Sequence, residues 1–244
     1  YKARRAEFEN DHLEYLSLTE EDGNFIENYK FLIDQSRKDI VTKLEEIKKL
    51  IEEHKLDKVE FQGLTAIGFQ GHLYQPLIYV NSDLIDVKPV PLNEGERDFV
   101  LDLRNFCVNE RDFFKDKELY LLRNMTRGHG IGFFEAGNFY PDFILWLLSN
   151  GRQYINFVDP KGLRNVRGQD DPKIAFYRTI KSIEEELRNQ DPRVTMNSFI
   201  ISNTRRSELS HWGLTDAQFE ERHVLFQKDD KETYIVKMLS MLNA

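Results

Sequence analysis

The chain has 244 residues, of which 40% are hydrophobic and 12% aromatic, so it can bury a core and is too apolar for a disordered protein. No run of about 18 apolar residues occurs, which excludes a transmembrane helix, and a single cysteine excludes a disulfide scaffold or a cysteine-rich zinc site. The net charge of −8 argues against a protein that holds nucleic acid through its overall charge.

Residues 1–58 predict a helical segment. Gly23 is the only glycine there, and four apolar residues recur at helical spacing within residues 38–58: Ile40, Leu44, Ile47 and Ile51. The segment is either a docking arm or an ordinary amphipathic helix on the core. Because the chain starts at Tyr1 without a charged-then-apolar leader, we expect part of a longer protein from a reducing compartment, the cytoplasm.

Residues 59–92 change character and lead into the core. Short apolar runs at 59–61, 67–69 and 77–80 are separated by Gly and Pro, which predicts short strands. Asn93 then fits the N-cap of a helix, with Glu96 three residues later as in a capping box.

Residues 93–206 predict an α/β core with a mixed sheet, in the order helix, three strands, helix, strand. The strands are predicted at 119–122, 140–147, 154–159 and 199–201. Asn150 and Gly151 form a tight turn between the second and third strands. Asp171 caps the second helix, with Pro172 at its first position. Residues 207–244 are expected to be an extension that packs on this core.

Two acids and one amine meet on the strands that the turn joins. Asp142 lies in the second predicted strand, and Asp159 and Lys161, two residues apart, leave the same face at the end of the third. Two close carboxylates repel unless a cation lies between them, and oxygen ligands suit Mg²⁺. The sequence therefore predicts a divalent-ion site of Asp142, Asp159 and the carbonyl of Pro160, with Lys161 placed to orient water or neutralise phosphoryl charge.

Pro141-Asp142 and Asp159-Pro160-Lys161, in this order of strands and helices, resemble the PD-(D/E)XK nuclease superfamily over about residues 93–206. That family often carries an acid on its first helix, where Glu96 matches in position and Glu94 competes with it. The resemblance implies a restriction-endonuclease-like mixed sheet flanked by helices. It also implies catalytic roles for Asp142, Asp159, Lys161 and Glu96.

Residues 72–77, 92–96 and 132–143 look like the C-terminal nuclease region of type III restriction endonuclease subunits and related helicase–nucleases. This resemblance implies a DNA endonuclease that depends on Mg²⁺ or Mn²⁺. Its implied partners are DNA and a helicase or translocase region of the same polypeptide or complex, with no membrane. The chain has no Gly-x-x-x-x-Gly-Lys-Ser/Thr loop, so ATP binding is not carried over.

A basic segment follows the expected ion site, since residues 161–206 carry a net charge of +4. Arg164 and Arg167 in the loop after Lys161 are predicted to hold phosphates, and Lys173 and Lys181 share a face of the next helix. For that face, DNA contact and plain solvation remain equal alternatives.

The Gly-rich stretch 128–132 precedes a strand rather than a helix, so we interpret it as a hairpin tip that faces DNA, with His129 as a phosphate contact or without a role. Glu135 either assists the ion site or is only a loop acid. For the whole chain, the alternative to a nuclease is a catalytically inactive module of the same fold that docks DNA or helps assembly.

Overall fold

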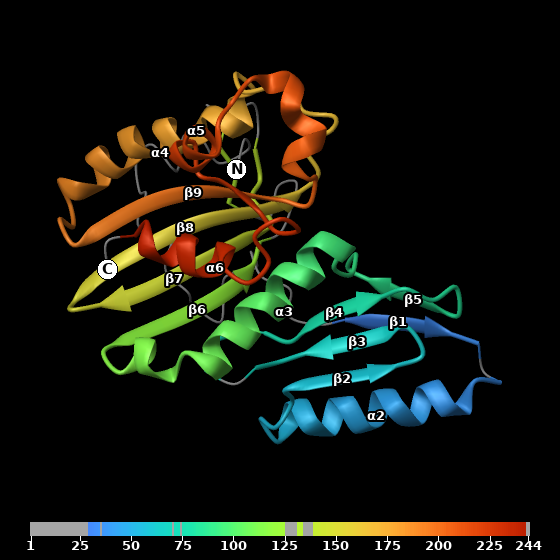
Figure 1. Cartoon of the computed structure of the whole chain (residues 1–244). Coiled ribbons are helices and arrows are strands. Elements are labelled where there is room, and N and C mark those ends of the chain that lie inside the picture. Colours follow the sequence, from blue (N-terminus) through green and yellow to red (C-terminus); the bar gives the residue numbers. More distant parts are fainter. Residues whose placement is uncertain are drawn as a thin grey trace.

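The computed structural model describes residues 29–34, 36–69, 71–73, 75–124, 131–133 and 139–242. In these residues a five-stranded mixed sheet forms the larger half of the molecule, and smaller sheets with one long helix form the rest (Figure 1). The protein is therefore α/β, as the sequence predicts. No helix in the described part of the chain is long and apolar enough to cross a membrane.

The larger sheet has the strand order β10-β9-β8-β7-β6. Its strands are β6 (Lys117–Arg123), β7 (Phe143–Ser149), β8 (Arg152–Lys161), β9 (Val194–Ser202) and β10 (Val224–Phe226). β6, β7 and β8 are successively antiparallel, whereas β9 runs parallel to both β8 and β10. The chain reaches β9 from β8 through a helix, which is the crossover that a parallel pair needs.

Helices cover both faces of this sheet (Figure 1). α4 (Pro172–Arg188) packs through Phe176 and Ile180 on one face, and α3 (Glu94–Asn109) and α6 (Tyr234–Ser240) pack on the other. Alternate strand residues belong to the two cores, as the pleat requires: Phe157 faces α4 and Val158 faces α3.

The smaller sheets lie on the far side of α3 (Figure 1). β2 (Lys58–Phe61), β3 (Leu64–Ile67) and β4 (Leu77–Val80) form an antiparallel sheet, and β1 (Lys30–Ile33) pairs with β5 (Ile85–Lys88). α2 (Lys38–Glu52) joins their core through Ile40 and Ile47. The described residues also include three short elements: η3 (Arg111–Phe114), η4 (Arg206–Trp212) and α5 (Asp216–Glu221).

The structure corrects the expected N-terminal helical segment. Residues 30–33 form a strand, and α2 ends at Glu52 instead of continuing to residue 58. His54 follows in the left-handed region at φ 54°, which stops the helix and turns the chain toward β2. The remaining part of that prediction, residues 1–28, lies outside the described residues.

Two further boundaries differ from the expectation. β7 begins at Phe143, so Asp142 lies in a bend just before the strand rather than within it. Pro141 offers no N–H to a neighbouring strand, and its carbonyl accepts from the Asn124 side chain instead. Residues 207–244 contribute β10, which adds a strand beside β9.

Candidate metal centre

The β7–β8 hairpin sets which side chains meet at the open end of the sheet. Asn150 and Gly151 have φ values of 50° and 72°, as the two central residues of a type I′ turn require. This turn pairs Ser149 with Arg152 and, at the other end of the ladder, Phe143 with Val158. The next residues outward, Asp142 and Asp159, are therefore opposite one another on the face that α4 covers.

The Asp142 carboxyl interacts directly with the carboxyl of Asp159. Burial raises the pKa of Asp142 well above its ordinary value, and the negative charge of Asp159 and a hydrogen bond between the two carboxyls raise it further. The negative charge of Glu96 acts in the same direction, and Lys161 opposes it. Without a cation, the pair therefore retains a proton that a divalent ion would displace.

Asp159 and Lys161 form an ion pair at the end of β8, and their side chains are 5% and 19% exposed. The Oδ2 atom of Asp159 is buried, and no hydrogen bond of ordinary geometry reaches it from the described residues. The Lys161 ammonium also lies 5.0 Å from the centre of the Phe139 ring. The Lys161 ammonium is thus the ion-pair partner of the Asp159 Oδ2 atom and lies within electrostatic reach of Asp142.

Glu96 approaches the same end from the first turn of α3. Asn93 caps the helix, and both the main-chain N–H and the side-chain amide of Asn93 donate to the Glu96 carboxylate. Arg123, the last residue of β6, pairs with Glu96 at 3.2 Å. Burial raises the pKa of Glu96 while Arg123 lowers it, and the charge of Asp159 raises it. The third predicted acid therefore lies within electrostatic reach of the pair.

The donor set fits a hard divalent cation. Among the described residues, no three Asp, Glu, His or Cys side chains are grouped so as to enclose a metal by themselves. Two carboxylates are present, however, and the Lys161 carbonyl accepts from Asn203 on the β9 side. Because carbonyls alternate along a strand, that of Pro160 points to the β7 side, beyond the Phe143–Val158 pair. Two acids, one carbonyl and water are a coordination set that Mg²⁺ accepts.

Three of the four predicted phosphate contacts are exposed. Arg164 pairs with Glu208, and Arg167 lines a shallow hollow together with His211 and Trp212. The Lys173 ammonium is 6.0 Å from the centre of the Phe139 ring, the ring that Lys161 also faces. Lys173 therefore lies on the same side as the acid pair.

Lys181 is in a different environment. Its ammonium donates to the carbonyl of Met196 at 2.6 Å and to Asn197 at 3.0 Å, and it pairs with buried Glu184. These bonds fasten α4 to β9, and the structure does not bring Lys181 together with the other predicted contacts. His129 and Glu135 lie outside the described residues.

Arg123 and Asn124 are two residues that sequence reasoning missed. Arg123 ends β6 and Asn124 follows it, yet neither belongs to the motif pair, and only the fold brings them to Glu96 and Asp142. The only feature that the sequence offers is a polar residue at the end of an apolar strand. That pattern is too common to identify Arg123 and Asn124 as functional residues.

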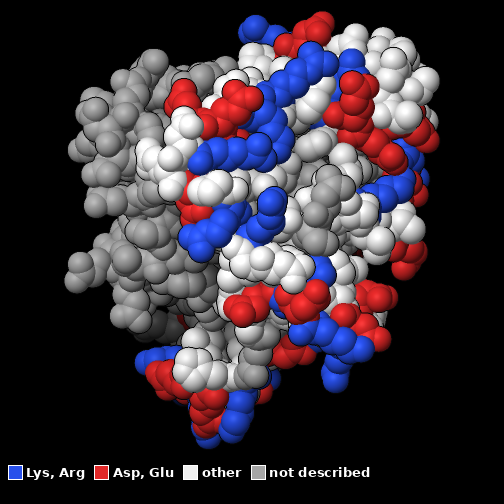
Figure 2. Space-filling view, turned by 90° about the vertical axis from the view of Figure 1, so that its left-hand side faces the viewer, with Lys and Arg blue, Asp and Glu red and all other residues white. Residues whose placement is uncertain are grey.

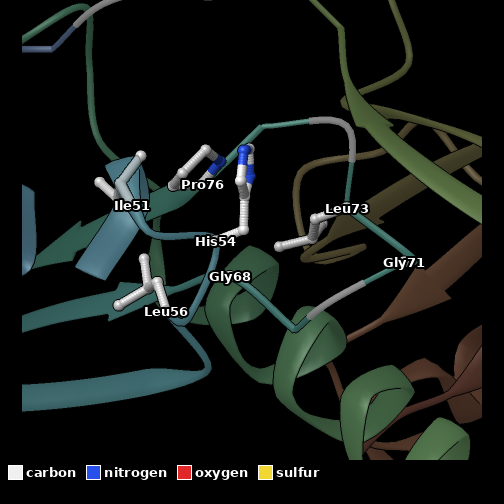
Figure 3. Close-up of a pocket in the computed structure, with 7 residues that line it drawn as sticks. All are labelled: Ile51, His54, Leu56, Gly68, Gly71, Leu73 and Pro76. Atoms are coloured by element: carbon white, nitrogen blue, oxygen red, sulfur yellow. The ribbon is translucent and has the colours of Figure 1, made fainter. Parts of the chain in front are cut away.

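A separate hollow lies beside the smaller sheet and contains none of the predicted residues. It is lined by Ile51, His54, Leu56, Gly68, Gly71, Leu73 and Pro76. Figure 3 shows the His54 ring rising between Pro76 and Leu73, with aliphatic side chains around it. The absence of acids there leaves the end of the larger sheet as the candidate metal centre.

The chain was compared with known protein families, curated proteins and solved structures. No protein-family profile, no curated protein and no solved structure matches the chain.

Proposed function

We propose that this chain is a DNA endonuclease domain that hydrolyses phosphodiester bonds with Mg²⁺ or Mn²⁺. The observation that carries the proposal is the hairpin register, which sets Asp142 opposite Asp159 with Lys161 on the same face. The order α3, β6, β7, β8, α4, β9 supports it, since that is the order expected of a restriction-endonuclease-like core.

The residues divide the chemistry as follows. Asp142, Asp159 and the Pro160 carbonyl would hold the cation, which would supply positive charge to polarise the scissile phosphate and lower the pKa of a water. Lys161 orients the attacking water or neutralises charge on the phosphoryl oxygens. Glu96, at the start of α3, contributes a further carboxylate with a supporting role. The phosphates that flank the scissile bond are held by Arg164, Arg167 and Lys173.

One observation favours the alternative of an inactive docking module. The chain carries a net charge of −8, and over the face in Figure 2 the basic side chains lie close beside acidic ones. In the proposed nuclease, a helicase or translocase region of the same polypeptide or complex supplies the stronger hold on DNA.

Plasmid cleavage distinguishes the two functions. We expect the wild-type chain to nick or cut supercoiled plasmid with Mg²⁺ or Mn²⁺ and not with EDTA. Lys161→Met should lower the rate by about 10²-fold or more, because a group that stabilises transition-state charge is lost. Asp142→Ala should abolish cleavage with the fold intact by circular dichroism. Full cleavage by both variants would overturn the assignment.

A further inference from the structure

Asn124 is attached to the residue pair that carries the first acid. Its main-chain N–H donates to the carbonyl of Asp142 at 2.8 Å, and its side-chain Nδ2 donates to the carbonyl of Pro141 at 2.8 Å. Both bonds reach the Pro141-Asp142 segment just before β7, where the regular ladder has not begun. The main-chain bond continues the β6–β7 pairing one residue beyond Arg123–Phe143, and the side-chain bond adds a hold on Pro141, the residue before Asp142.

The same side chain also holds the chain at Ile131. Nδ2 donates to the Ile131 carbonyl at 2.8 Å, and Oδ1 accepts from the Ile131 N–H at 2.9 Å. Two carbonyls and one N–H around the amide fix its orientation, since the flipped amide would face two acceptors with an oxygen. Asn124 is 5% exposed, so these bonds do not compete with bulk water.

We propose that Asn124 is a positioning residue for the metal centre: it fixes the backbone that presents the Asp142 carboxylate to the cation shared with Asp159. This inference rests on the proposed function. A ligand must be held within a fraction of an ångström to serve a cation of strict geometry, and Asp142 lies outside the regular ladder of the sheet. Residues that orient metal ligands commonly change metal affinity by about 10- to 100-fold when they are removed.

Asn156 provides a matched control within the same sheet. It is fully buried, its Nδ2 donates to the carbonyls of Leu145 and Tyr154, and its Oδ1 accepts from Asn197. It therefore makes three side-chain bonds, as Asn124 does, but none of them reaches the Pro141-Asp142 segment that Asn124 holds. General destabilisation of the sheet would lower the metal affinity of both the Asn124 and the Asn156 variants. Misplacement of the Asp142 ligand would lower it in the Asn124 variant alone.

The test is calorimetric titration of the whole chain with Mg²⁺ and Mn²⁺, below the unfolding temperature of each variant measured by circular dichroism. We expect Asn124→Ala to raise the Kd for the metal by about 10-fold or more. Asn156→Ala should lower the unfolding temperature and leave the Kd within about twofold of wild type. Asn124→Ser, which keeps one hydrogen-bond donor, should be more stable than Asn124→Ala. Its Kd for the metal should lie between those of wild type and Asn124→Ala.

The outcomes separate the two proposals. Wild-type chain that takes up no metal contradicts the proposed function, and the role of Asn124 fails with it. Site-specific uptake by wild type together with an unchanged Kd in Asn124→Ala and Asn124→Ser overturns the positioning role alone. An equal loss of affinity in Asn124→Ala and Asn156→Ala also overturns it, because general destabilisation would then explain both.

Discussion

Asp142 and Asp159 are the residues on which the proposed chemistry depends. In the metal-free protein the negative charges of their carboxylates would repel each other. Asp159 is buried and Asp142 is half-buried, and two close carboxyls in such a site do not both ionise without a compensating charge. Lys161 supplies one positive charge through its ion pair with Asp159, which leaves the second acid to be compensated by a proton or a cation. A cation bound in the proposed manner would therefore stabilise the site.

The repulsion between the two carboxylates predicts that the free energy of unfolding depends on pH. Since the pKa of Asp142 is raised in the folded state, this carboxyl binds a proton more readily in the native chain than in the unfolded chain above about pH 4, whereas the lowered pKa of buried His223 acts in the opposite direction. The free energy of unfolding should therefore fall as the pH rises through the folded-state pKa. Urea denaturation in EDTA at about pH 5 and about pH 8 measures the effect.

Asp142→Asn is the control for this pH dependence. It should reduce the loss of stability between the two pH values, and the raised pKa of Glu96 should account for part of the remaining slope. Added Mg²⁺ should restore the stability of wild type at high pH and have no such effect on the variant. The same pH slope in both proteins would mean that the carboxyls are not coupled.

At the scale of elements, the two-residue turn of the β7–β8 hairpin determines that the acids face each other. Gly151 is at φ 72° with nothing within 4 Å of an added Cβ, so an alanine there is strained without a steric clash. Gly151→Ala should cost about 1–2 kcal/mol in the free energy of unfolding, measured by chemical denaturation.

Gly213 offers a matched comparison, because it has φ 66° and open space and lies at the end of η4. Gly213→Ala should cost a similar amount. Both variants should keep the metal affinity of wild type, since the ladder from Ser149–Arg152 to Phe143–Val158 preserves the register. A loss of metal binding in Gly151→Ala as large as that of Asp159→Asn would contradict this account of the hairpin.

The same elements show what the sequence could predict. Asn93 and Asp171 cap α3 and α4, and the turn at Asn150-Gly151 is present, because these signals are local. The opposition of Asp142 and Asp159 follows from that turn and from the two-residue period of a strand. The bend at Asp142, in contrast, depends on bonds from Asn124, which no local pattern specifies.

Contacts between distant segments account for the other differences. β1 pairs with β5, which lies more than fifty residues away in the sequence. The sequence of residues 30–33 does not specify which strand it will pair with. Lys173 and Lys181 look alike on one helix face, yet Glu184, Met196 and Asn197 bind only the second. The sequence pattern predicts a face, and only the packed structure tells which of its charges is already used.

At the scale of the whole molecule, charge decides how DNA can be held. Lys173→Gln should weaken the binding of a DNA duplex and lower the slope of log affinity against log salt by about 1, measured by fluorescence anisotropy. Lys181→Gln should leave that slope unchanged and lower the unfolding temperature, because it removes bonds between α4 and β9. Equal effects of the two changes on the salt slope would argue against this division.

We propose that Asp142 and Asp159 share one divalent cation. The most direct measurement is anomalous X-ray diffraction from crystals of the whole chain grown with Mn²⁺. We expect one strong anomalous peak within about 2.0–2.4 Å of an oxygen from each carboxylate, and no peak there in Asp159→Asn. A structure whose Mn²⁺ lies elsewhere, or whose two carboxylates remain hydrogen-bonded with no metal between them, would contradict it.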